Sequence, residues 1–499
     1  MSTLISKIAF TFLALFVLIT SVAGNNLQIS NITYDEGTNS LNFDISWDNA
    51  FYINSTWQDH IYIFAKYRNA NSSSWKSVMF EETGHSDDDA DMVFWSAPNS
   101  TSIDGKRIAV KAGHISTFTS GTQGGNCTAI LADNIDFFHP SFKVFGIEMI
   151  QISSVGNEYY IGDGTSENRF HIGSDTTQAY FWDQNIFGSV NVGNGPDDIN
   201  TTHPDGIPVA SIDGHIFRPP NNIMKYEISQ IQYVEFLNTL NRIAQNNRVA
   251  TDVSGTSIID VYVFTQTPTV AIFTRNGVRC DEILPNGGPI TFYCDYSGNG
   301  VPNEYNDGQN IAMNYLSGED LFAYLDWAGL GPLNEIEYEQ LCRGSENPVP
   351  NEFAWGTSGY TSVGIASGST KGTPEEFLLG APHIGPLKGS SSPMRCGAAA
   401  TATSNRLTSG ASAYGIMELS GNATELVIAL RSSSSFTKIT GSSDGIIDNF
   451  GYTNETNWVK EIAQKGGHIS NDAYTVSRRN TNLLPYSARS SFNGGRGGY

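Results

Sequence analysis

The residues best suited to chemistry lie in one short stretch, residues 414–426 (YGIMELSGNATEL). It contains two glycines, Gly415 and Gly421, and two carboxylates, Glu418 and Glu425. Glycine permits backbone turns that a Cβ would forbid, and a turned backbone exposes carbonyl oxygens. Carbonyl oxygens together with a carboxylate are the ligands that a hard cation such as Ca²⁺ prefers. The stretch alone is therefore open to two interpretations, a cation-binding loop or a glycine-containing turn between buried strands.

Two other stretches gather oxygen ligands. Residues 294–308 (CDYSGNGVPNEYNDG) place five of them around two glycines: Asp295, Asn299, Asn303, Glu304 and Asp307. Their spacing is not that of an EF-hand and the final glutamate is missing, so both a cation loop and a polar surface loop are open. The run Asp87-Asp88-Asp89 is typical of a solvated loop tip, with cation binding as the alternative.

The bulk composition excludes some classes of partner. The chain has 499 residues, and 28 Lys and Arg against 50 Asp and Glu give a net charge of −22. Such a field repels nucleic acid and anionic membrane surfaces, so no nucleic-acid partner is expected. Charged residues make up only 16%, while Gly (50), Tyr (22) and Phe (27) are abundant, which is typical of a loop-rich β protein.

Residues 1–24 are typical of a secretory signal peptide. Lys7 supplies the positive charge, residues 8–22 form an apolar segment too short to span a bilayer comfortably, and small residues follow. A retained membrane anchor is the alternative. No later stretch is long and apolar enough to cross a membrane, so we expect a secreted or cell-surface protein without a transmembrane anchor.

Export makes disulfides plausible for the five cysteines. Cys280 and Cys294 bracket a short loop rich in Gly and Pro, and closing it would contribute roughly 3 kcal/mol. Cys342 with Cys396 is the second candidate pair, which leaves Cys127 unpaired. Connectivity cannot be read from a sequence, so these pairings remain hypotheses.

The elements that must position these residues fall into two parts. Residues 25–142 predict a β-sandwich, because short alternating strands recur between polar turns, at 41–47, 60–68, 75–80, 91–97 and 107–112. An apolar run at 142–152 starts the second part. In this second part, apolar residues at helical spacing predict an amphipathic helix within 224–247 that begins at Ser229. Further helices are predicted at 317–330 and 334–342. Ser317 and Asn334 are suited to cap the last two.

Five motifs then occur in an order that resembles one family. They are MKYEISQIQYVEFLN, YLSGEDLFAYLDWAGLGPLNEIEYEQLCRG, EFAWGT, YGIMELSGNATEL, and QKGGHISNDAYTVSRRN with a following GGRGGY. Residues 143–499 thereby resemble the formylglycine-generating enzyme, or sulfatase-modifying factor, domain. They look closest to exported members found in Bacteroidetes-type bacteria. The resemblance implies an α+β chain, in which the β-sandwich is followed by a C-type-lectin-like fold rich in irregular loops.

The resemblance also implies what this chain lacks. Enzymes of the family oxidise a substrate cysteine to formylglycine with copper, O₂ and a pair of cysteines. Here Asn471 and Val476 occupy the two cysteine positions, and no cysteine follows Cys396. Neither side chain offers a thiolate to copper, so no copper is expected. Cys342 matches a structural cysteine whose usual partner position is Gly497 in this chain.

The same resemblance assigns a structural Ca²⁺ to residues 414–426. The implied ligands are Glu418 and the carbonyls of Leu419, Gly421 and Ala423. The leading hypothesis is a secreted scaffold without formylglycine-generating activity that binds a glycan, peptide or surface protein through loops at 343–413 and 427–465.

Two alternatives stay open. One is an enzyme with a different site in the same cleft, lined by polar residues: His468, Asp472, Arg478, Arg479 and Arg489. The other is a purely structural cell-surface component.

Overall fold

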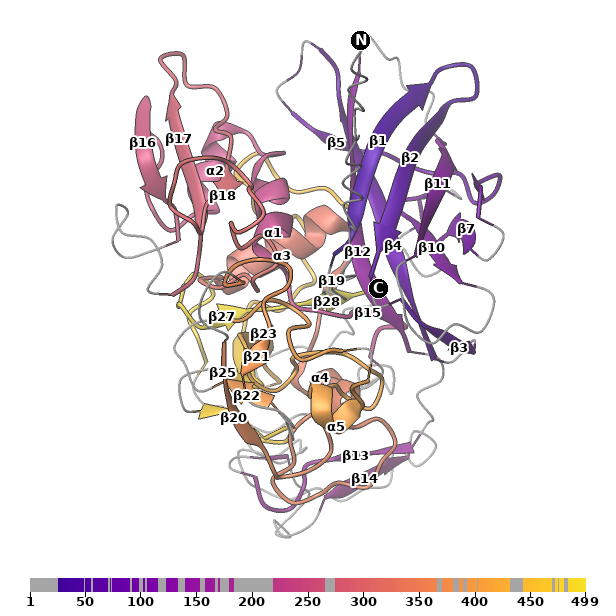
Figure 1. The fold of residues 1–499 in the computed structure, drawn as a ribbon, viewed down its shortest axis with the longest axis vertical. Coiled ribbons are helices and arrows are strands. Elements are labelled where there is room, and N and C mark those ends of the chain that lie inside the picture. Colours follow the sequence, from indigo (N-terminus) through magenta and orange to yellow (C-terminus); the bar gives the residue numbers. More distant parts are fainter. Residues whose placement is uncertain are drawn as a thin grey trace, which may run out of the picture.

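The structure, a computed structural model, is mostly β-strand with few helices (Figure 1). The predicted signal peptide at 1–24 and Asn471 lie outside the described residues. Among those residues, no helix has the length and apolar character needed to cross a membrane. The structure describes residues 26–48, 50–54, 57–70, 72, 74–89, 92–97, 102–103, 106–114, 123–132, 140–152, 158–166, 169–170, 179–183, 219–264, 274–365, 370–379, 386–388, 393–401, 403–430, 443–468, 472–473, 475–479 and 483–499.

Two sheets at one end of the molecule share an apolar core. The first has the strand order β1 (Gln28–Asp35), β2 (Ser40–Trp47), β11 (Gln123–Ile130), β6 (Ser86–Asp87). The second has the order β19 (Gly331–Pro332), β28 (Gly497–Gly498), β15 (Asn222–Met224), β12 (Ser141–Gln151), β4 (Trp57–Arg68), β10 (Val110–His114), β7 (Met92–Ser96). β3 (Tyr52–Asn54) and β5 (Lys76–Ser77) also pair with β4, and β8 (Ser102–Ile103) pairs with β9 (Lys106–Arg107).

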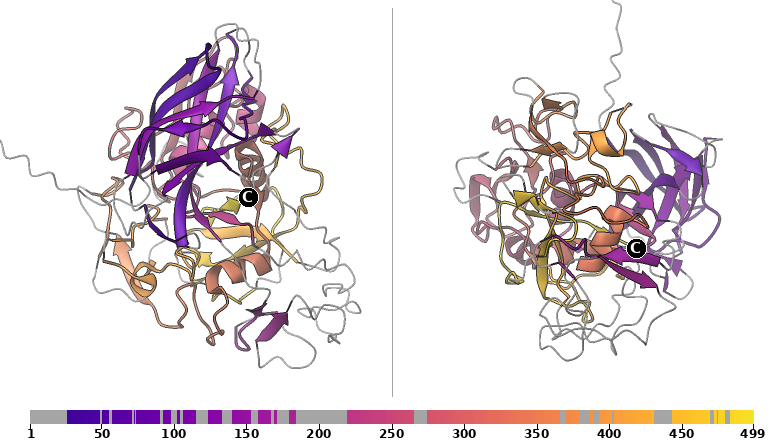
Figure 2. Two further views of the ribbon diagram at one scale, coloured as in Figure 1. Left: turned by 90° about the vertical axis from the view of Figure 1, so that its right-hand side faces the viewer. Right: turned by 90° about the horizontal axis from the view of Figure 1, so that it is seen from below.

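Strand β4 is buried on both faces, which explains its position in the middle of the second sheet. Ile61 and Ile63 point toward the first sheet, while Tyr62 and Phe64 point to the other side. Because side chains alternate across a strand, this strand joins two separate cores. Behind it lie the helices, so the layers are sheet, sheet and helices (Figure 2).

The second sheet crosses the predicted boundary between residues 142 and 143. That boundary falls inside β12, which pairs antiparallel with β4 over ten residues of register, Val144 opposite Ala65. The core behind the sheet also crosses it: the ring of Phe64 lies 4.9 Å from that of Trp327, and Phe145 lies 4.8 Å from Trp327. The described strands of 25–142 are therefore packed directly on the segment predicted to be a second domain.

Three helices form where local signals predict them, with one correction. α3 (Gly318–Ala328) and α4 (Glu335–Arg343) are capped by Ser317 and Asn334, each in a capping box. The single helix predicted within 224–247 is instead two, α1 (Gln230–Leu237) and α2 (Arg242–Asn247), and a short α5 (Arg406–Ser409) was not predicted. The break occurs because the Asn238 side chain bonds the backbone of Phe292 in both directions, at 2.8 and 2.9 Å.

The rest of the described chain forms small sheets joined by irregular loops. The three-stranded sheets are β16 (Ser257–Tyr262), β17 (Val278–Ile283), β18 (Tyr293–Cys294); β21 (Leu378–Leu379), β20 (Thr361–Ile365), β22 (Pro386–Lys388); and β24 (Ile462–Lys465), β23 (Thr424–Ile428), β27 (Asn493–Gly494). The pairs are β13 (Glu158–Ile161) with β14 (Tyr180–Asp183) and β25 (Gly467–His468) with β26 (Asp472–Ala473).

All five cysteines are buried free thiols in this structure. Cys280 and Cys294 lie on the neighbouring strands β17 and β18, in one apolar cluster. Cys342 and Cys396 lie in two different clusters, and the Cys396 thiol contacts the Glu227 carbonyl at 3.6 Å. A Cβ at Gly497 would overlap Leu325, so that position has no room for a cysteine. The disulfide pairings therefore stay predictions.

Candidate functional site

The 414–426 stretch is a strained turn that leads into the buried strand β23. Glu418 and Asn422 both have positive φ, 56° and 59°, and Gly415 and Gly421 lie at 87° and 92°. Positive φ is unfavourable for residues with a Cβ, so surrounding contacts must hold Glu418 and Asn422 in place.

The Glu418 carboxylate is buried and only half satisfied. One oxygen accepts a hydrogen bond from the Gly397 amide at 2.8 Å, while the other, Oε2, has no hydrogen-bond partner. Burial raises the pKa of Glu418 to about 7, against the opposing charge of Arg496. A buried carboxylate oxygen without a hydrogen-bond donor is suited to a cation. Glu418 shares this feature with Glu148, Glu282, Glu339 and Asp326.

Two more buried glutamates surround the same turn. Glu227 accepts hydrogen bonds from the Ala423 amide, at 2.9 Å, and from the Asn422 side chain. Glu425 pairs with Arg496, Nε to Oε1 at 2.6 Å, and both side chains are inaccessible to solvent. Burial and the charge of Glu425 hold the pKa of Glu227 well above its usual range. One guanidinium thus lies among three carboxylates.

The fit of this turn to Ca²⁺ is incomplete. Glu418 Oε2 is available, but the Leu419 carbonyl already accepts a hydrogen bond from the Tyr338 hydroxyl. A cation that used the Leu419 oxygen would have to share it with that hydroxyl or displace it. Calcium at Glu418, Leu419, Gly421 and Ala423 therefore stays a prediction, in which Glu418 is the ligand that the structure favours.

Val476, the position that the resemblance matches to a second catalytic cysteine, is closed to solvent. Val476 is 1% exposed, packs in an apolar cluster, and donates its amide to the Glu352 carbonyl at 2.8 Å. Next to it, Arg343 pairs with Glu352 and donates to Ser477 at 2.9 Å. A buried valine offers no ligand to copper, so the residues at this position do not fit a copper site.

Two arginines of the alternative enzyme site, Arg479 and Arg489, form ion pairs with carboxylates. Arg479 makes two bonds to Glu335, both at 3.1 Å. Arg489 makes two bonds to Asp320 of α3, at 2.6 and 2.8 Å, and a third to the carbonyl of Asn247 at the end of α2, at 2.8 Å. The structure therefore assigns these two arginines to separate ion pairs. Arg478 is half-buried beside Arg479, and the side chains of His468 and Asp472 lie outside the described residues.

The 294–308 loop is built around its own carboxylates. Asp295 is buried, accepts the backbone amides of Gly298, Asn299 and Gly300 at 2.8 to 3.1 Å, and pairs with Arg279. Asp307 is buried as well and accepts the amide of Glu304 at 2.7 Å. Both carboxylates therefore hold the loop in shape by accepting its backbone amides. The Arg279 guanidinium supplies the positive charge beside Asp295, where the sequence left a bound cation as one of two alternatives.

At the Asp87–Asp89 run, Asp87 and Asp88 accept backbone amides, of Phe94 at 3.0 Å and of Asn126 at 2.7 Å. Asp88 is exposed. This arrangement favours the loop-tip interpretation.

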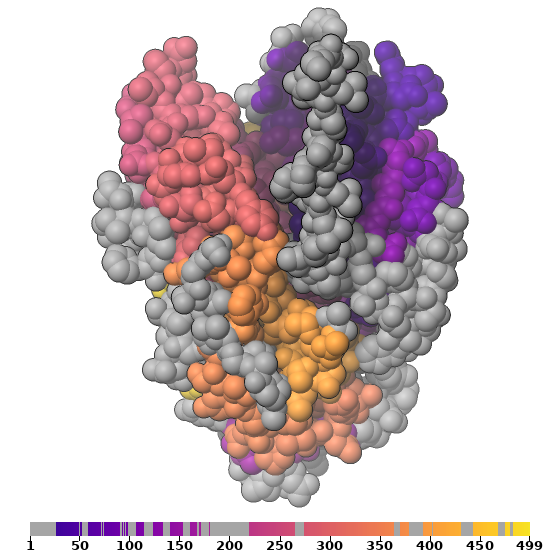
Figure 3. All heavy atoms as spheres, in the orientation of Figure 1, coloured from indigo at the N-terminus to yellow at the C-terminus, as the bar shows by residue number. Residues whose placement is uncertain are grey.

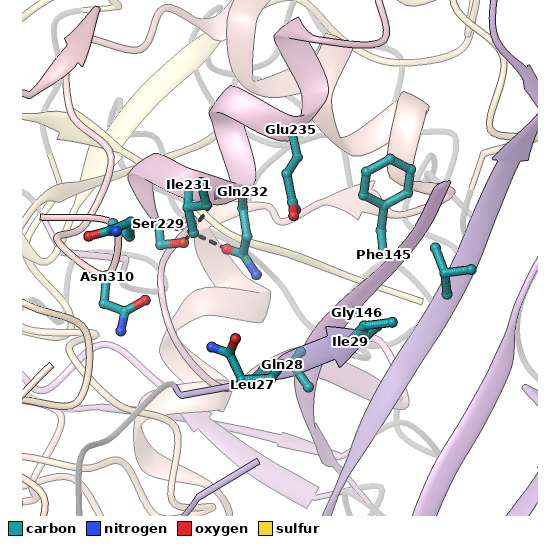
Figure 4. A pocket seen from close by; sticks show the side chains of 12 residues that line it. Leu27, Gln28, Ile29, Phe145, Gly146, Ser229, Ile231, Gln232, Glu235 and Asn310 are labelled. Atoms are coloured by element: carbon teal, nitrogen blue, oxygen red, sulfur yellow. Dashed lines mark hydrogen bonds between the residues drawn. The ribbon is translucent and has the colours of Figure 1, made fainter. Parts of the chain in front are cut away.

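A cleft of about 200 Å³ lies between β1, β12 and α1 (Figure 4). In the space-filling view the molecule is hollowed between the β16–β18 sheet and the N-terminal strands (Figure 3). The polar part of the cleft lining is mostly amide and carboxyl: Gln28, Ser229, Gln232, Glu235, Gln309 and Asn310. The apolar part is Leu27, Ile29, Val144, Phe145 and Ile231. Amide and carboxyl groups over an apolar floor can bind a neutral, hydroxyl- or amide-rich ligand.

Among the described residues that line this cleft, Glu235 carries the one charged side chain. It points from α1 into the cavity, and no hydrogen bond or ion pair engages it among the described residues (Figure 4). Burial raises the pKa of Glu235 to about 7, which Lys143 opposes. Lys143 itself donates to the Asn238 carbonyl at 3.2 Å. Near neutral pH the Glu235 carboxyl can therefore both donate and accept a hydrogen bond.

Sequence reasoning missed Glu227 and Glu235. Glu235 lies next to the apolar stripe of α1, where its spacing predicts exposure to solvent. Its environment depends on β1 and β12, which are 80 or more positions earlier in the chain, and no local signal reports it.

Comparison with known proteins gives no relative: no family model and no curated protein matches the chain.

Proposed function

We propose that this protein is a secreted or cell-surface scaffold that binds a ligand and has no formylglycine-generating activity. In this proposal residues 25–142 form a β-sandwich, and the following residues form an atypical C-type-lectin-like domain of the sulfatase-modifying-factor type. The Ca²⁺ predicted at residues 414–426 would stabilise that domain. The order of the five motifs and the absence of both catalytic cysteines support this reading.

The observation that carries the proposal is the burial of Val476. A cysteine pair that transfers electrons to copper and O₂ must be accessible to a peptide substrate. Here the matching position is 1% exposed and is backed by the Arg343–Glu352 ion pair. Both the chemistry and the access that the reaction needs are missing at this position.

The cleft beside Glu235 is the site where we place the ligand. Its amide and carboxyl lining can hydrogen-bond the hydroxyls of a glycan or the backbone of a peptide. A strongly anionic ligand is disfavoured because Glu235 and the net charge of −22 would repel it.

Glycan and peptide arrays test this placement. We expect the wild-type protein to bind a neutral glycan or peptide, and Glu235→Ala and Asn310→Ala each to weaken binding about tenfold, because each removes hydrogen bonds to the ligand. Glu36→Ala, at an exposed turn between β1 and β2, is the matched control and should bind as the wild type does. No binding on either array, or unchanged binding by both cleft variants, would contradict the placement.

A further inference from the structure

Three carboxylates from distant parts of the chain meet at the C-terminal end of α3. They are Asp326 in the last turn of α3, and Asp444 and Glu455 in the loop 443–455. One oxygen from each lies within 4.8 Å of the others. Carboxylates this close repel one another when they are ionised, and a proton or a bound cation would reduce that repulsion.

Asp326 supplies the strongest sign that a ligand belongs here. Its side chain is 0% exposed. Its Oδ2 accepts hydrogen bonds from the Thr453 hydroxyl at 2.6 Å and from the Asn454 amide at 3.1 Å. Its Oδ1 has no hydrogen-bond partner. A buried carboxylate oxygen without a donor is costly unless a proton or a cation occupies it.

Lys66 lies close enough to Asp326 and Asp444 for their charges to interact, but it forms no ion pair with either. Lys66 uses its three hydrogens on neutral acceptors: the Trp327 carbonyl at 2.7 Å, the Gly445 carbonyl at 2.7 Å and the Ser77 hydroxyl at 2.8 Å. Within the part of the chain that the structure describes, none of the three carboxylates has an ion pair.

The surroundings favour positive charge in two further ways. The end of α3 carries the negative pole of the helix dipole, and Gly329 ends the helix directly after Ala328. A cation bound between the three carboxylates would also offset their mutual repulsion.

We propose that Asp326, Asp444 and Glu455 bind one Ca²⁺, which fastens the loop 443–455 onto the end of α3. The donors are all oxygens, with neither sulfur nor imidazole, which selects a hard cation. Three oxygens within 4.8 Å of one another leave a position that is at most about 2.8 Å from each, close to the Ca²⁺–oxygen distances of about 2.3–2.6 Å. Water completes the coordination, since Asp444 and Glu455 are half-buried. This site is separate from the 414–426 turn and does not depend on the proposed function.

Calcium titration of the metal-free full chain tests the proposal, by calorimetry and by the melting temperature. We expect ~1 mM CaCl₂ to raise the melting temperature of the wild type. Asp444→Asn combined with Glu455→Gln should bind one Ca²⁺ fewer, or bind it at least tenfold more weakly. Glu418→Gln should leave this site intact, and Asp281→Asn, an exposed carboxylate elsewhere, is the control.

The same experiment can overturn the proposal. Unchanged Ca²⁺ stoichiometry and affinity in the Asp444/Glu455 double variant would do so, as would a wild type that binds no Ca²⁺. Equal stabilisation by MgCl₂ would overturn the choice of metal. The double variant removes two repelling charges, so it should fold and melt no lower than the metal-free wild type; a lower melting temperature would count against mutual repulsion as the reason for the site.

Discussion

Replacing Arg496 with methionine is expected to lower the free energy of unfolding by about 4 kcal/mol, because it leaves buried carboxylates without their counter-charge. Arg496 is 1% exposed and contacts Glu425 at 2.6 Å, and it also donates to the Lys225 carbonyl at 3.2 Å. The substitution would leave Glu227, Glu418 and Glu425 facing one another in the interior. Urea denaturation of the wild type and the variant measures the difference.

Two companion variants make this result specific. Arg496→Met combined with Glu425→Gln removes both members of the pair and should recover part of the loss, which keeps the test decisive if the single variant does not fold. Glu82→Gln breaks the half-exposed pair between Arg107 and Glu82, at 3.1 Å, and should cost less than about 1 kcal/mol. A loss of less than about 1 kcal/mol for Arg496→Met would contradict the central role assigned to this guanidinium.

Replacing Glu235 with glutamine is expected to change how stability depends on pH. The pKa of Glu235 is raised from 4.5 to about 7 in the folded chain, so the folded state holds this proton more tightly than the unfolded state does. The stability that this proton contributes is present below pH 4.5 and is lost as the pH rises toward 7. Integrated over that window, the loss is at most roughly 3 kcal/mol, because solvent screens this partly exposed side chain.

Glutamine cannot ionise, so Glu235→Gln should equal the wild type near pH 4 and exceed its stability by up to roughly 3 kcal/mol at pH 8. Urea midpoints across this range measure the difference, with Glu36→Gln as the exposed control. A difference between the two proteins that stays constant with pH would show that Glu235 is not desolvated in the cleft.

Helices whose ends are determined by neighbouring residues could be predicted from the sequence. Ser317 and Asn334 begin α3 and α4 as predicted, because a capping box is complete within four residues. The helix predicted within 224–247 failed at Asn238, whose side chain bonds Phe292 on a distant segment. No periodicity within one stretch can report such a contact.

Features that depend on contacts between distant parts of the chain could not be predicted from local sequence patterns. The sequence predicts that a second domain starts at residue 143, inside β12, and the pairing of β12 with β4 depends on residues about 80 positions away. The carboxylates Glu227, Asp326 and Asp444 look like ordinary polar residues in their own stretches. Their chemistry appears only when remote elements bury them or bring them together. By contrast, the glycine-containing stretch itself points to Glu418 and Glu425 as candidates, while the assignment of Glu418 as a Ca²⁺ ligand comes from the resemblance and stays a prediction.

The most direct test of the central claim is a single assay for formylglycine. The purified chain would be incubated with copper, O₂ and a peptide containing the CxPxR motif, and the peptide analysed by mass spectrometry against copper without protein. The account predicts that the cysteine stays a thiol, because Asn471 and Val476 stand at the positions that the resemblance matches to the catalytic cysteines, and Val476 is buried. Copper-dependent conversion of that cysteine to an aldehyde would contradict it.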